Sequence, residues 1–253
     1  MFQQHLALAL CLVLQAPGLA HADTTLVAVA ANFAGAAEAV SAAFRDETGH
    51  DAQITTGSTG KLYAQITEGA PFEVLLSADA KTPEKLLDEG LAVANSSFTY
   101  AIGGLTLWSV DADLIGADAK ASLASDKIRF LAIANPDLAP YGVAAKEALT
   151  NLGLWDAVQP KIVLGQNIGQ VFALANTGAA DAAFVATSAL VGPDAPVTGS
   201  RFDVPQDLFT PIRQDAVLLN TGKDNVAAVA FLAFLKSDQA KEIINDFGYH
   251  LPE

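Results

Sequence analysis

Short apolar runs of strand length alternate with segments of helical periodicity along most of the chain. Strands are predicted at 24–31, 52–55, 73–77, 128–134, 161–164 and 182–186. Helices are predicted at 34–46, 61–68, 83–89, 141–152 and 168–176, and a last helical region at 225–247 is expected to break at 237–238. This alternation is typical of α/β proteins with mainly parallel sheets.

Two further strand patterns indicate where the chain crosses between two lobes. One covers 100–110 and is interrupted by Gly103 and Gly104, and the other covers 215–220. We therefore predict a first lobe made of 23–104 plus 217–253, and a second lobe made of 105–216. The alternative is a single large sheet, which α/β folds of this length also allow.

The first 22 residues have the pattern of a secretory signal peptide. The apolar run at 6–14 is too short to span a bilayer as a helix, and a Gln-Ala-Pro-Gly segment ends it. Ala20 and Ala22 form a small-x-small cleavage site, although the segment before the run contains no Lys or Arg. Cleavage after Ala22 would remove Cys11, the only cysteine, and would place the mature chain in the periplasm.

Composition and charge narrow the possible partners. Hydrophobic residues make up 51% of the 253 residues, which is enough for one or two ordinary cores. The formal net charge of −14 disfavours nucleic acid and anionic membrane surfaces as partners. No long acidic tract is present, so the scattered acidic residues most simply indicate a well-hydrated surface.

The sequence offers little of the chemistry that an enzyme needs. His50 and His250 are the only histidines after the predicted cleavage site, and neither has a nucleophile nearby in a known motif. The segment ending in Gly60 and Lys61 departs from a phosphate-binding P-loop, and no zinc-ligand spacing occurs. We therefore expect a protein that is not an enzyme. A secreted acid–base enzyme using carboxylates such as Asp79 and Asp137 is the remaining alternative.

Four predicted strand-to-helix junctions carry small residues and neutral donors. They lie at 31–33, 57–60, 139–142 and 166–169. Each would present unpaired backbone N–H groups and the positive end of a helix dipole, a combination that binds anions without Lys or Arg. Two junctions fall in each predicted lobe, so together they predict an anion clamp between the lobes.

Several motifs resemble the periplasmic molybdate-binding proteins of ABC importers. They are VAVAANF at 27–33, STGKLYAQI at 58–66, NPDLAPYGVAAKEAL at 135–149, GLW at 153–155 and QNI at 166–168. The resemblance covers almost the whole chain after the signal peptide. It implies a type II periplasmic-binding-protein fold with two α/β lobes, each a mixed and mainly parallel sheet flanked by helices, and an oxyanion held in the cleft between them.

The resemblance also implies which residues bind the ligand. Asn32 stands where the family donates from side chain and backbone, and Thr59 stands where it usually has a serine hydroxyl. Tyr141 matches a backbone donor position whose hydroxyl also donates in some members, and Ile168 matches a position that offers only its backbone N–H. The molybdenum would be held through the oxygens of molybdate, with no direct metal ligand and no cofactor.

One position departs from the family pattern. Many members have a ligand tyrosine where this chain has Ala186, within FVATS at 184–188. Tyr141 could replace that hydroxyl from the other side of the cleft. Further candidates for the oxyanion site are Ala31, Ser58, Ala186 and Ser188. Lys61, also close in sequence, is expected to be an exposed helix charge.

The expected donors also limit the ligand class. Phosphate keeps a proton near neutral pH and needs an acceptor, whereas molybdate, tungstate and sulfate are fully deprotonated and need donors only. Residue types alone leave sulfate or another small anion open as an alternative. The resemblance implies molybdate, with tungstate as a second ligand, delivered by a monomeric binding protein to the membrane permease of an ABC importer.

Overall fold

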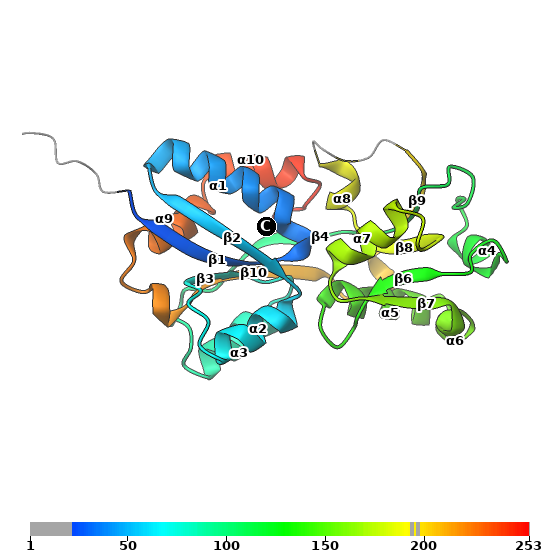
Figure 1. Ribbon diagram of the computed structural model, residues 1–253, viewed down its shortest axis with the longest axis horizontal. Helices are drawn as coiled ribbons and strands as arrows, with labels where there is room; N and C mark the ends of the chain where they lie inside the picture. Colours follow the sequence, from blue (N-terminus) through cyan, green and yellow to red (C-terminus); the bar gives the residue numbers. More distant parts are fainter. Residues whose placement is uncertain (1–21, 193–194, 196–197, 253) are drawn as a thin grey trace, which may run out of the picture.

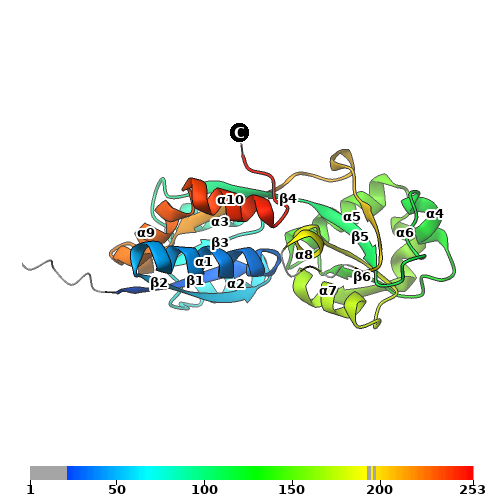
Figure 2. The same cartoon turned by 90° about the horizontal axis from the view of Figure 1, so that it is seen from above.

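Two five-stranded sheets organise the chain, one in each lobe of the computed structural model (Figure 1). The structure describes residues 22–192, 195 and 198–252. All but the last residue of the predicted signal peptide at 1–22 therefore lies outside the described residues. The predicted α/β class with two lobes is confirmed. The lobes lie side by side along the long axis, as Figure 2 shows from above.

The first lobe contains the N-terminal and C-terminal parts of the described chain. Its sheet has the order β2-β1-β3-β10-β4. The strands are β1 (Thr24–Ala30), β2 (Asp51–Gly57), β3 (Val74–Leu76), β4 (Phe98–Gly103) and β10 (Ile212–Leu218). The helices and 3-10 turns are η1 (Ala31–Phe33), α1 (Ala34–Thr48), α2 (Thr59–Thr67), α3 (Lys81–Asp88), η4 (Asn220–Gly222), α9 (Val226–Phe234) and α10 (Asp238–Asp246).

Alternate side chains of β1 bury the two faces of this sheet. Val27 and Val29 point into a core shared with α1, α9 and α10, whereas Ala28 belongs to the opposite core with Leu62 and Leu86 of α2 and α3. Because successive residues of a strand face opposite sides, a continuous apolar run is what a sheet covered on both faces requires. Figure 1 shows the two helical layers above and below the sheet.

The second lobe repeats this plan. Its sheet has the order β7-β6-β8-β5-β9. The strands are β5 (Leu105–Ser109), β6 (Leu131–Ala134), β7 (Ile162–Gly165), β8 (Ala182–Ala186) and β9 (Ser200–Asp203). The helices and 3-10 turns are α4 (Ala119–Ala124), α5 (Pro140–Asn151), α6 (Trp155–Val158), η2 (Gln159–Lys161), α7 (Ile168–Asn176), α8 (Ser188–Val191) and η3 (Gln206–Leu208).

Both sheets are mixed in the same way. In the first, β1 pairs in parallel with β2 and β3, while β10 runs antiparallel to β3 and β4. In the second, β6 pairs in parallel with β7 and β8, while β5 runs antiparallel to β8 and β9. Strands β1 and β6 thus have parallel neighbours on both sides, where the strand order reverses, and ligands of open α/β sheets bind at the carboxyl ends of strands at such a point.

One crossing between the lobes lies next to the boundary drawn from the sequence, and the other lies earlier in the chain than its boundary. The first occurs at Gly104, between β4 of the first sheet and β5 of the second. The second lies before Ile212, because all of β10 pairs with the first sheet, whereas the boundary drawn from the sequence was between 216 and 217. A register irregularity between Gln214 and Asp215 interrupts the alternation there, which hid the start of the strand.

Most predicted elements occur near their predicted bounds. Helix α7 and strand β8 have the predicted limits, and the break in the last helical region is confirmed by Ser237, whose side chain caps α10. Helix α4 and strand β9 were not predicted, because both are short and rich in polar or small residues. Among the described helices, none has the length and apolar character needed to cross a membrane.

The start of α5 depends on a glycine, which gives a test of the fold. A Cβ on Gly142 would lie 2.2 Å from the backbone oxygen of Ala134, an atom that cannot rotate away. We expect Gly142→Ala to cost about 1–3 kcal/mol of unfolding free energy. The melting temperature should fall by roughly 2–4 °C for each kcal/mol lost. Gly116→Ala is the matched control, because its Cβ would meet only Ser122 Oγ at 3.9 Å. Equal melting temperatures for the two variants would contradict this packing.

Candidate functional site

A small cavity lies between the lobes, where the first turns of several helices meet. Its volume is about 10 Å³, close to the space for one water molecule. The residues lining it are Ala30, Ala31, Asn32, Gly57, Ser58, Thr59, Ala78, Ala139, Pro140, Tyr141, Asn167 and Ile168. They come from both lobes and include residues from each of the four junctions predicted from the sequence. We call this space the small cavity.

Helix starts surround the small cavity. Strand β1 leads through η1 into α1, and α2, α5 and α7 begin at Thr59, Pro140 and Ile168. The first N–H groups of each helix have no partner within it, and each N-terminus carries about half a positive charge. At α7 the Asn167 side chain accepts from Gln170 N at 2.9 Å, which fixes the loop before Ile168. The arrangement therefore directs backbone donors and positive dipole ends at one point.

Two buried hydroxyls add side-chain donors on the first-lobe side. Thr59 Oγ1 accepts a hydrogen bond from Ala78 N at 3.1 Å, so its own hydrogen is available to an acceptor in the cavity. Ser58 Oγ is buried and has no hydrogen-bond partner. Both residues are almost fully buried, and an unsatisfied buried hydroxyl is costly unless something accepts from it.

Asn32 lines the small cavity, but its side chain is engaged within the protein. Its Nδ2 donates to Gln214 Oε1 at 2.7 Å and to Tyr249 Oη at 3.1 Å. Its backbone oxygen accepts from Tyr249 Oη at 2.7 Å. Both amide hydrogens are thus used, and in this arrangement the backbone N–H is the group that Asn32 can offer an anion. The side-chain role implied by the resemblance would require the amide to exchange partners.

Tyr141 also lines the cavity, yet its hydroxyl lies toward the crossing between the lobes. A Cβ on Gly103 would be only 2.1 Å from Tyr141 Oη, so any other residue where β4 ends would displace this hydroxyl. Burial raises the pKa of the Tyr141 hydroxyl well above its usual value, while the nearby Tyr249 adds to the rise and the Asn32 and Gln214 amides oppose it. The hydroxyl therefore stays protonated at any physiological pH.

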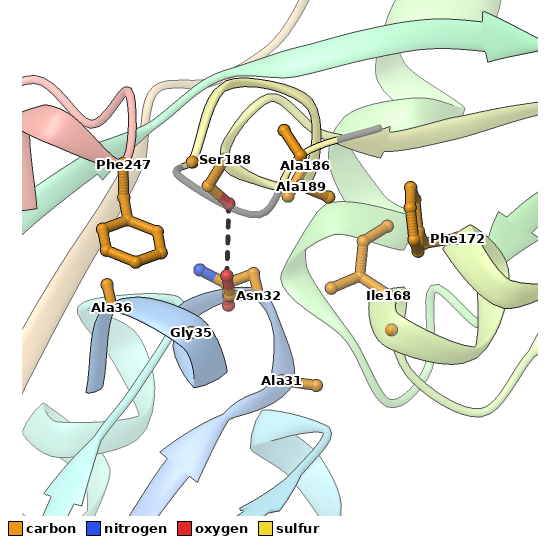
Figure 3. A pocket seen from close by; sticks show the side chains of 13 residues that line it. Ala31, Asn32, Gly35, Ala36, Ile168, Phe172, Ala186, Ser188, Ala189 and Phe247 are labelled. Atoms are coloured by element: carbon orange, nitrogen blue, oxygen red, sulfur yellow. Dashed lines mark hydrogen bonds between the residues drawn. The ribbon is translucent and has the colours of Figure 1, made fainter. Parts of the chain in front are cut away.

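Ala186 and Ser188 lie beside a second, larger cavity rather than the small one. This cavity has a volume of about 250 Å³ and shares Ala31, Asn32 and Ile168 with the small cavity. Figure 3 shows Ser188 above Asn32, whose backbone oxygen accepts from Ser188 Oγ at 3.2 Å. Ser188 therefore joins the lobes instead of lining the small cavity, and Ala186 leaves open space on that side.

The two lobes touch around the small cavity. Gly60 N donates to Leu138 O of the second lobe at 2.9 Å, and a Cβ on Gly60 would meet that oxygen at 3.0 Å. Lys61 Nζ donates to Gln166 Oε1 across the cleft, on the exposed side. Lys61 thus lies at the rim and does not line the small cavity, as expected of an exposed helix charge. These contacts describe a closed arrangement of the lobes.

The residues that line the small cavity include no charged side chain. Asp79, one of the two carboxylates considered for an enzyme, accepts from Thr82 N at 2.8 Å at the start of α3. Asp137, the other, is exposed and does not line the cavity. Within the described part of the chain, no group of three or more His, Cys, Asp or Glu side chains is placed to hold a metal ion.

Two residues of this region were missed by the sequence analysis. Gln214 and Tyr249 hold the Asn32 side chain, although they lie 182 and 217 positions away in the chain. Gln214 is fully buried in β10, but it stands between Arg213 and Asp215, and this polar run gave no signal of burial in the sequence. Tyr249 follows the last helix and gave no signal in the sequence.

The sequence of this chain is similar to those of a known protein family. Residues 25–250 match the family model of the bacterial extracellular solute-binding proteins. The molybdate-binding protein ModA of Rhodobacter capsulatus is 47% identical over 243 residues, which cover 96% of this chain and 94% of that protein. ModA of Azotobacter vinelandii is 46% identical over 232 residues, covering 92% of each chain.

A solved structure shows the same similarity. The periplasmic molybdate-binding protein of Azotobacter vinelandii superposes with a TM-score of 0.87 at 41% sequence identity, covering 90% of this chain and 100% of that one. The resemblance found in the sequence motifs is thereby confirmed. The chain belongs to the bacterial extracellular solute-binding protein family, in which it is similar to the ModA proteins.

Proposed function

We propose that this protein binds molybdate, and also tungstate, in the small cavity. The observation that carries the proposal is the cavity itself, where helix starts from both lobes and two buried hydroxyls converge without any charged side chain. The names of the two ModA relatives, which are 47% and 46% identical, support molybdate as the ligand. Thr59, Asn32, Tyr141 and Ile168 are the proposed binding residues, with Ser58 and Ala31 beside them.

The donor chemistry favours a fully deprotonated tetrahedral anion. Such an ion accepts at every oxygen, and the residues lining the small cavity offer N–H and O–H groups without a carboxylate to repel it. Each hydrogen bond to a charged group contributes roughly 1.5–3 kcal/mol net. An ion with four oxygens needs more room than one water, so the lobes must part slightly around it. Opening and closing of the lobes then admits and encloses the ligand.

The biological role follows from the family. An extracellular solute-binding protein works outside the cytoplasmic membrane, and residues 1–22 would direct the chain to the periplasm and be removed after Ala22. There a monomer would deliver the oxyanion to the membrane permease of an ABC importer. The molybdenum is cargo, held through its oxygens, and binding needs no cofactor and no catalysis.

Native mass spectrometry and calorimetry test this function directly. The purified protein is first stripped of bound anions and then titrated with molybdate, tungstate, sulfate and phosphate. We expect submicromolar binding of molybdate and tungstate and much weaker binding of phosphate, because the residues lining the cavity include no carboxylate to accept its proton. Preference for sulfate would indicate a carrier of a different anion, and no binding of any of the four would contradict the proposal.

The hydroxyl of Thr59 provides a single-atom test. Thr59→Val removes the donor while keeping the shape, and we expect molybdate affinity to fall about 10- to 150-fold, which corresponds to roughly 1.5–3 kcal/mol. Thr59→Ser keeps the hydroxyl and should bind nearly as well as the natural protein. Thr67→Val, on the exposed side of the same helix, is the control. Calorimetry showing equal affinity for Thr59→Val and Thr67→Val would rule out Thr59 as a ligand.

The buried tyrosines predict how stability depends on pH. Burial raises the pKa of Tyr249 to about 12 and those of Tyr100 and Tyr141 well above 10.0. In the unfolded chain tyrosines ionise near 10. Raising the pH above about 10 therefore favours the unfolded state, and the melting temperature should fall steadily between pH 10 and 12. Tyr249→Phe should show a smaller fall, and an equal fall in both proteins would show that Tyr249 ionises normally.

A further inference from the structure

A buried row of polar side chains leads from the small cavity into the crossing between the lobes. Asn32 Nδ2 donates to Gln214 Oε1 at 2.7 Å, and Tyr100 Oη donates to the same oxygen at 3.2 Å. Gln214 has no solvent exposure, and Tyr100 is also buried. The Gln214 carbonyl therefore fixes the orientation of a side chain that stands at the cavity wall.

The other end of the Gln214 amide faces a group from the second lobe. Gln214 Nε2 and Tyr141 Oη are both buried without a hydrogen-bond partner. A Cβ on Gly103 would lie 2.9 Å from Gln214 Nε2 and 2.1 Å from Tyr141 Oη, so the two atoms lie within about 5 Å of one another. An N–H donor and a hydroxyl oxygen are thus left facing the same point, and a small shift of either side chain brings them to hydrogen-bond distance.

The two groups belong to different lobes. Gln214 lies on β10 of the first sheet, and Tyr141 lies in the first turn of α5 in the second lobe. Gly103 ends β4, next to the crossing at Gly104. A hydrogen bond between Gln214 and Tyr141 would therefore span the hinge, and it could form only while the second lobe is held against the first.

We propose that Gln214 is a positioning residue that couples the closed arrangement of the lobes to the Asn32 side of the ligand cavity. When the lobes close around the ligand, its carbonyl holds Asn32 and a small shift brings its Nε2 to hydrogen-bond distance of the Tyr141 hydroxyl. When the lobes open, Tyr141 moves away with the second lobe. The Gln214 amide is then free to rotate, and it no longer fixes the orientation of the Asn32 side chain. Gln214 thereby lowers the rate at which the bound oxyanion escapes. The inference rests on the proposed function, because it assigns Gln214 a role at the same site.

The chemistry of the neighbouring groups fits this role. Burial keeps the hydroxyls of Tyr100, Tyr141 and Tyr249 protonated, so the row holds neutral donors and acceptors at every physiological pH. Gln214 supplies both a donor and an acceptor from one planar group. A glutamate of the same shape would supply only acceptors when ionised and would place a negative charge near the anion.

The test compares ligand kinetics in variants of the full-length mature protein. Gln214→Met keeps the length of the side chain and removes its amide, and Tyr141→Phe removes only the hydroxyl. We expect each to raise the molybdate dissociation rate about tenfold in stopped-flow fluorescence, with little change in the association rate. The double variant should be no faster than the faster single variant, because both changes remove the same hydrogen bond.

A matched variant separates this role from a general loss of stability. Thr25→Val removes a hydroxyl that is equally buried and unpartnered but lies in β1 and does not line either cavity. It should leave the dissociation rate unchanged, whatever it does to the melting temperature.

Gly103 offers a steric check of the same geometry. Gly103→Ala should displace the Tyr141 hydroxyl, speed molybdate release and expand the liganded protein in small-angle scattering. Adding Tyr141→Phe should partly relieve these effects, since the atom at 2.1 Å is then gone and the next ring atom lies at 3.0 Å.

The outcomes distinguish the inference from the function on which it rests. If the natural protein binds molybdate but Gln214→Met releases it no faster than Thr25→Val, the inference is overturned and the function stands. Additive effects of Gln214→Met and Tyr141→Phe would also overturn it. If the natural protein does not bind molybdate, the proposed function fails and the inference falls with it.

Discussion

An oxyanion enclosed between two lobes gives up the hydrogen bonds of its water shell, and the protein must replace them with donors of its own. In this chain the residues around the small cavity carry no charge, and the whole protein has a formal net charge of −14. Attraction must therefore come from short-range donors and helix ends. The rest of the structure serves to bring enough donors and helix ends to one point.

The topology of each lobe supplies such donors. In each lobe one inner strand, β1 or β6, has parallel neighbours on both sides, so the segments at its carboxyl end diverge and leave a crevice. Helices begin at these ends, and facing the two sheets toward one another brings their N-termini together. Small residues make the approach possible, as at Gly60, where the backbones of the two lobes join at 2.9 Å. The binding chemistry is thus mostly backbone chemistry that the fold positions.

Much of this was predictable from the sequence, because helix starts leave local signals. The junctions at Thr59, Tyr141 and Ile168 were recognised from small residues and caps, and the structure brings all three to one cavity. Contacts between distant segments left no such signal. The amide of Asn32 is held by Gln214 and Tyr249, and the hydroxyl of Tyr141 lies toward the hinge, and neither of these arrangements was predicted from the sequence.

The central claim is that one tetrahedral oxyanion is held by neutral donors from both lobes, and a crystal structure of the molybdate complex tests it most directly. Anomalous scattering from molybdenum would locate the ion independently of the protein model. The account predicts a single peak between the first turns of α2, α5 and α7, with Thr59 Oγ1 and the Ile168 N–H about 3 Å from molybdate oxygens. A peak in the larger cavity beside Phe172, or a charged side chain in contact with the ion, would contradict it.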